Sequence, residues 1–147
     1  MTADSQWALQ QIVYSTLRGN ATLQSLTGAS PATVYDHVPQ TVWEKPNSSG
    51  FFPPYVVIGP SSGGEYDTKL DDGMDQTFDV HTFSRGRGMK ETKQIMSAIC
   101  DALDQQALSV SGHTLVQLTL ETFQDMLEDD GLTRHGWQQF RALTVAS

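Results

Sequence analysis

The stretch Pro53-Pro54-Tyr55-Val56-Val57-Ile58-Gly59 decides the fold. Tyr55 to Ile58 form a continuous run of β-branched and aromatic residues, which is typical of a strand buried on both faces. The prolines and Gly59 mark the two ends of this run. It therefore predicts a first central strand, and the elements on either side can be read outward from it.

Downstream, residues 75–83 place Phe78, Val80 and Thr82 in alternation with polar residues, as expected of a half-buried strand. A turn over 84–88 leads into a helix that ends at Leu103 and carries a stripe of apolar residues. Alternation then predicts a strand over 116–120 and a closing strand over 137–145, joined by an acidic turn at 128–132.

Upstream, helical spacing of apolar residues predicts a helix over 5–18, with Ser5 accepting hydrogen bonds from the amides of its first turn. Asn20 is expected to cap a short second helix that ends by Gly28. The segment between residues 28 and 54 contains several prolines, which prevent long regular structure. Its short apolar stretches are expected to lie along a sheet edge or a neighbouring subunit.

This order of elements predicts an α+β fold with a mostly antiparallel sheet of about four strands and two main helices packed on one face. We expect a single domain over 1–147, with an extended arm at about 40–53. A flexible loop is expected at about 60–74, because serine, glycine and carboxylates occur there without periodicity.

Composition narrows the functional classes. The chain has 147 residues and a formal net charge of -8, which disfavours tight binding to a phosphate backbone. Cys100 is the only cysteine, so an intrachain disulfide is excluded. No apolar window approaches the roughly 18 residues needed to span a bilayer, and we expect a protein made in the cytosol without membrane contact.

The sequence contains no strong motif for catalysis or metal binding. Residues 59–63 match the nucleophile-elbow pattern around Ser61, but no helical pattern follows the serine to stabilise an oxyanion. The four histidines, at 37, 81, 113 and 135, lack metal-ligand spacing, and the acidic clusters do not fit a calcium loop. We therefore expect no enzyme activity, no metal and no cofactor.

A basic cluster lies where a strand turns into a helix, although positive charge opposes the helix dipole at that end; it consists of Arg85, Arg87, Lys90 and Lys93. A solvated turn, pairing with acids of a neighbouring subunit, and phosphate binding are the three interpretations of this cluster.

Taken together, the opening helix with its short follower, Val34 to Pro39, Pro54 to Gly59 and the strand from Asp75 resemble the tail terminator, or tail completion, proteins of long-tailed bacteriophages. The glycine-bearing basic turn, the helix ending at Leu103 and the last two strands continue the likeness over most of the chain.

The resemblance implies a structural virion protein that is assembled in the host cytoplasm. It would form a homo-oligomeric ring, as a hexamer, at the head-proximal end of the tail tube. There it would terminate tube polymerisation and contact the major tail tube protein and the head-side connector, with DNA only in transit through the lumen. On this basis the candidate interface or lumen residues are Arg85, Arg87, Lys90, Asp71, Asp72, Asp129 and Asp130.

Three alternatives remain open at this stage. A head-side neck or connector protein would also assemble into an acidic ring, but it would contact a different neighbouring protein. A small serine hydrolase would use Ser61 with a histidine, and a monomeric ligand-binding domain would show no self-association.

Overall fold

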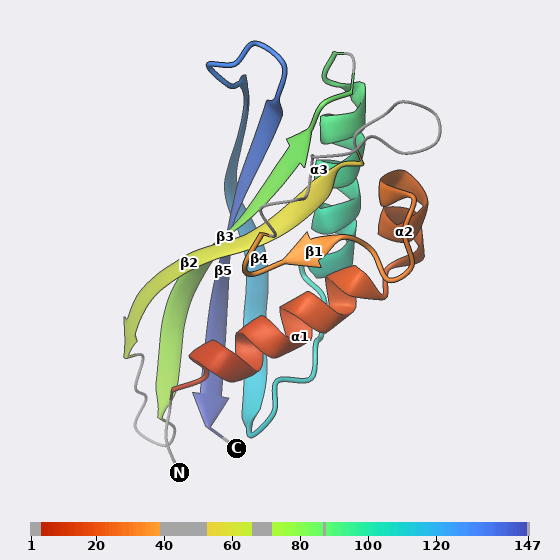
Figure 1. Cartoon of the computed structure of the whole chain (residues 1–147). Coiled ribbons are helices and arrows are strands. Elements are labelled where there is room, and N and C mark those ends of the chain that lie inside the picture. Colours follow the sequence, from red (N-terminus) through yellow and green to blue (C-terminus); the bar gives the residue numbers. More distant parts are fainter. Residues whose placement is uncertain (1–3, 39–52, 66–71, 87, 147) are drawn as a thin grey trace.

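The computed structural model describes residues 4–38, 53–65, 72–86 and 88–146. Figure 1 shows the path of the chain through these ranges. The elements follow the order α1 (Gln6–Arg18), α2 (Ala21–Thr27), β1 (Val34–Tyr35), β2 (Tyr55–Glu65), β3 (Gly73–Ser84), α3 (Lys90–Leu103), β4 (His113–Leu127) and β5 (Arg134–Ala146).

The strands form one five-stranded sheet in the order β1-β2-β3-β5-β4. Every pairing is antiparallel except that of β1 with β2. The predicted α+β class and mostly antiparallel sheet are therefore confirmed. The strand beyond the predicted four is β1, whose Val34 pairs with Val56 along the sheet edge.

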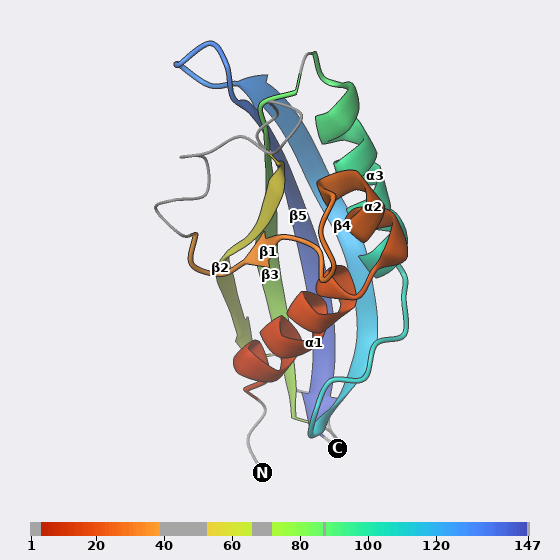
Figure 2. The same ribbon diagram turned by 45° about the vertical axis from the view of Figure 1, so that its right-hand side comes forward.

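All three helices cover the same face of the sheet, as the two views in Figures 1 and 2 show. The side chains of β3 and β5 alternate between buried and half-buried positions, so one row faces the helices. In that row Phe78 and Phe140 stack with their ring centroids 5.6 Å apart. Among the helices of the described ranges, none combines the length and apolar character needed to cross a bilayer.

The two predicted helix starts have different outcomes. Asn20 caps α2 as predicted, since its side chain accepts a hydrogen bond from the Leu23 amide at 3.0 Å. The capping role predicted for Ser5 is wrong, because its side chain makes no cap hydrogen bond. The fully buried Ser5 hydroxyl instead lies 2.7 Å from Thr144 Oγ1 and accepts a bond from Gln76 Nε2 at 2.9 Å, which ties the start of α1 to β3 and β5.

The prediction of a loop at about 60–74 is wrong for both ends of that range that the structure describes, because β2 extends to Glu65 and β3 begins at Gly73. Residues 61–65 continue β2 and pair with Met74 to Phe78 of β3, after a register irregularity between Ile58 and Ser61. Backbone pairing needs no apolar side chains, so serine and glycine are tolerated where a strand is exposed, and a bulge accommodates Pro60. Residues 66–71 and the arm predicted at 40–52 lie outside the described ranges.

Helix α3 lies close against the sheet at Gly136 of β5. A Cβ atom at that position would lie 2.5 Å from Met96 Sδ and 3.1 Å from Thr92 Cγ2. The absence of a side chain at Gly136 therefore allows α3 to settle onto the sheet, with Ile95, Ile99 and Leu103 buried beneath it.

Candidate assembly interface

Arg85 and Asp130, two of the predicted site residues, meet at one end of the sheet. Arg85 Nη2 lies 3.8 Å from Asp130 Oδ2. Asp130 also accepts hydrogen bonds from the Thr133 hydroxyl and from the amides of Leu132 and Thr133. These bonds, that of the Thr133 hydroxyl foremost, lower the pKa of Asp130 to about 2. The basic turn and the acidic turn thus form one corner of the same subunit.

The remaining predicted residues divide between the two ends of the sheet. Lys90, the first residue of α3, and Asp129 are exposed at the same end as Arg85. Asp72 is exposed at the opposite end, just before β3, where its carbonyl accepts a bond from the Ala146 amide. Arg87 and Asp71 lie outside the described ranges. Among the five predicted residues that the structure describes, Asp72 therefore lies apart from the other four.

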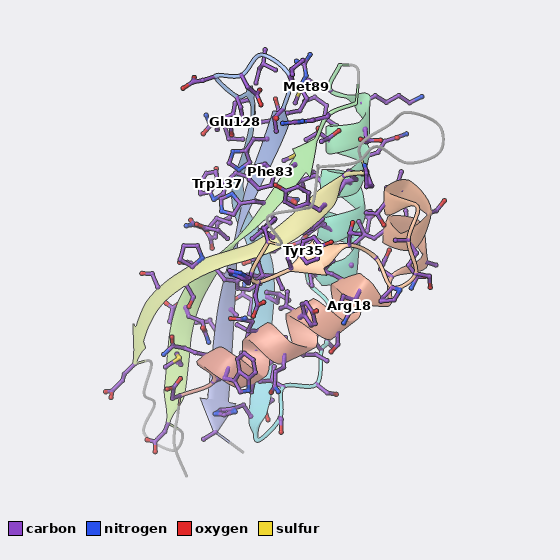
Figure 3. The ribbon with its side chains drawn as sticks, in the orientation of Figure 1. Arg18, Tyr35, Phe83, Met89, Glu128 and Trp137 are labelled. Carbon is purple, nitrogen blue, oxygen red and sulfur yellow. The ribbon has the colours of Figure 1, made fainter. Side chains whose placement is uncertain are left out.

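The face of the sheet turned away from the helices, here called the open face, carries a row of rings across its strands. Tyr55 and Phe83 stack at a centroid distance of 5.2 Å, and Phe83 stacks on His135 at 4.4 Å. Trp137 and Glu128 project from this side of the sheet in Figure 3. Further along, Arg141 forms a two-bond ion pair with Asp75. Among the described residues this face is mixed aromatic and polar, with few charges.

A chain of hydrogen bonds links two histidines on the open face. His135 Nδ1 lies 2.6 Å from Glu128 Oε1, and His135 Nε2 lies 2.8 Å from His81 Nδ1. Because a carboxylate only accepts, His135 donates from Nδ1, and the Nε2 of a neutral His135 then accepts from His81. Burial, followed by the neighbouring His135, lowers the pKa of His81. His81 is therefore part of a cross-strand histidine pair.

The sheet ends in two unlike edges. One edge is β4, a 15-residue strand that pairs only with β5. Part of its outer side is covered, since Leu118 O accepts the Gln105 amide and Asp104 Oδ1 accepts the Leu120 amide. The other edge is β1, which has two residues and covers only Val56 and Val57 of β2.

Between α3 and β4 the surface is hollowed by what we call the α3–β4 groove, with a volume of about 190 Å³. It is lined by Lys93, Met96, Cys100, Leu120, Phe123 and Gln138. Cys100 is half-buried and lines this groove. Burial, then the nearby Asp104 and Asp101, raises the pKa of the thiol.

No site for catalysis or metal binding emerges in the described part of the chain. Ser61 lies within β2, opposite Phe78, and the strand continues after it to Glu65, so Ser61 does not sit at the strand-to-helix turn of a nucleophile elbow. The described ranges contain no group of three metal-ligating side chains close enough to hold an ion.

Sequence reasoning missed the exposed hydrophobic side chains. Trp7 is 64% exposed on α1 and Phe123 is 63% exposed on β4. Helical spacing offered one signal, since Trp7 lies off the face formed by Leu9, Val13 and Leu17. For Phe123 the sequence offered no such signal, because a bulge between Leu120 and Thr122 shifts the alternation of side chains in β4.

The described part of the chain thus offers an open sheet face and two edges of different length. Comparison with known proteins identifies the class of protein. The family model for tail completion protein gp17 matches residues 11–145. Tail completion protein gp17 of Bacillus phage SPP1 is 34% identical over 116 residues, which cover 79% of this chain and 83% of that protein.

Among solved structures, a chain of the virion of a native gene transfer agent particle is similar over 99% of this chain and 100% of its own length. The TM-score is 0.81 and the sequence identity 28%. The chain belongs to the gp17 tail completion family, and it is a structural component of a phage-type virion.

Proposed function

We propose that this tail completion protein assembles into a closed ring of six copies at the head-proximal end of the tail tube. In that position it stops addition of further tube subunits and presents a surface to the head-side connector. The stoichiometry and position rest on the family resemblance.

The observation that carries the proposal is the pair of unlike sheet edges. A long strand, β4, bounds one side, and the two-residue β1 with helix α1 bounds the other. A contact between two different patches repeats head to tail, and it closes into a ring when the rotation per subunit divides a full turn. A twofold dimer would use the same patch on both copies instead.

We assign the contact with a neighbour, inside or outside the ring, to the corner formed by Arg85, Lys90, Asp129 and Asp130. Arg87 is proposed to take part in the same contact. Arg85 is already paired with Asp130 of its own subunit, so the corner offers both signs of charge. Asp72 lies at the opposite end of the sheet, and we propose that Asp71 acts with it. The net charge of -8 supports free passage of DNA through the lumen, because strong phosphate contacts would retard it.

The proposal is tested by native mass spectrometry of the free protein and by affinity purification from particle lysates. We expect a six-copy species, free or templated by the tube, and copurification with the major tube protein. Recovery with the portal or head connector alone would favour a head-side neck protein. Rings of normal stability from the Arg85→Glu, Arg87→Glu double variant would refute the assignment of the charged corner to subunit contacts.

A further inference from the structure

Gln138 of β5 has a buried hydrogen-bond acceptor that the fold leaves unused. Its side chain is 2% exposed, and its Nε2 donates to the Met96 carbonyl at 2.9 Å. That bond fixes the amide orientation, because only the nitrogen can donate to a carbonyl. Gln138 Oε1 has no partner, although Gln138 lines the α3–β4 groove. Buried acceptors are rarely left unpaired without a reason.

The groove also has the room and the lining for an aromatic side chain. An apolar cavity of about 150 Å³ admits a benzene ring, and this groove has about 190 Å³. Met96, Leu120 and the ring of Phe123 supply apolar walls, and thioether sulfur packs well against aromatic rings. A matching occupant therefore combines an aromatic body with one hydrogen-bond donor.

Trp7 has this combination. The exposed large hydrophobic side chains of the described ranges are Trp7, Val116, Phe123, Met126, Leu127 and Leu132. Of these only Trp7 carries a donor, the indole N–H, and it has no acceptor of its own to compete. Tryptophan is also among the residues that most often anchor protein interfaces.

Trp7 cannot fill the groove of its own subunit. It lies on α1, which packs over β1 and β2, whereas the groove lies between α3 and the opposite edge strand β4. Figure 2 shows the start of α1, where Trp7 lies, beside β2 and on the other side of the helix-covered face from α3. Trp7 therefore belongs to one lateral side of the subunit and the groove to the other, as a head-to-tail contact requires.

We propose that Trp7 of one subunit inserts into the α3–β4 groove of the next copy, where the Gln138 amide shifts so that its buried Oε1 accepts the indole N–H. This inference rests on the proposed ring and names the contact that closes it. Lys93 and Asp125, paired at 2.8 Å at the rim, would then flank the inserted ring.

Substitution of Trp7 tests the contact through the assembly equilibrium, measured by mass photometry or native mass spectrometry. Trp7→Phe keeps the aromatic body and loses the donor, and it should weaken subunit association about tenfold, or about 1.4 kcal/mol. Trp7→Ala should weaken it about a hundredfold or more. The control is Ser25→Ala, which truncates an exposed side chain of α2 that belongs neither to the groove nor to the charged corner and should assemble normally. All three variants should keep the melting temperature of the free subunit.

Cys100 gives a second, independent readout, because it is the only thiol of the chain and lines the groove. Alkylation of Cys100 by N-ethylmaleimide should be at least tenfold slower in assembled rings than in free subunits.

Rings that assemble normally with Trp7→Ala, or that leave Cys100 as reactive as in free subunits, would overturn this contact and leave the ring itself standing. If neither free protein nor purified tails yield any ring, both the contact and the proposed function fail.

Discussion

The substitution Ser5→Ala removes only one oxygen atom, but it should lower the free energy of unfolding of the subunit substantially. The Ser5 hydroxyl is fully buried and bridges Thr144 Oγ1 at 2.7 Å and Gln76 Nε2 at 2.9 Å. Alanine leaves both of these buried groups without that partner. Each unsatisfied group costs about 1–3 kcal/mol, and the amide of Gln76 can reorient in part. We therefore expect a loss of about 2–4 kcal/mol in the free energy of unfolding.

Urea unfolding followed by circular dichroism measures this loss, provided that the unfolding slope stays unchanged. The control is Ser15→Ala, the same substitution at an exposed position of the same helix, which should change stability by less than about 0.5 kcal/mol. In the Ser5→Ala, Thr144→Val double variant, the loss should be smaller than the sum of the single losses, because one orphaned hydroxyl is removed. A Ser5→Ala effect no larger than that of Ser15→Ala would refute the reasoning.

Three further predictions concern packing, pH and capping. Gly136→Ala should cost about 1–3 kcal/mol in thermal or urea unfolding, because the new methyl group meets Met96; an unchanged midpoint would show that α3 can move away freely. Burial and His135 hold the pKa of His81 below its unfolded value of about 6.5, so the unfolded state binds more protons and stability should fall as pH drops below that value. His81→Gln should flatten this part of the stability curve, and an identical slope in the variant would contradict the assignment. Asn20→Ala, which removes the cap of α2, should cost about 1 kcal/mol, with Asn20→Asp expected to retain most of the stability.

Local signals in the sequence predicted the elements well. Alternation marked β3 and β5, and the apolar stripe marked α3. Asn20 followed the capping rule because its contact lies three residues away. Ser5 broke that rule because the partners of its hydroxyl, Gln76 and Thr144, lie far along the chain, and nothing in the local pattern distinguishes the two environments.

The candidate interface was harder to predict, since it depends on distant pairings. The ion pair of Arg85 with Asp130 unites two turns that the sequence treats as separate patches. The α3–β4 groove exists only because β5 places Gln138 beneath α3 while β4 bulges beside it. The composition showed that the protein is acidic, and the family resemblance implied that it is a virion component. The surfaces by which its copies can join became visible only in the packed structure.

Electron cryomicroscopy of the intact particle tests self-association most directly. The map should contain a closed ring of six copies between tail tube and head connector, with α1 of each copy facing the α3–β4 groove of the next. A neck region in which this chain is absent, occurs as a single copy, or meets its neighbour through identical twofold patches would contradict the account.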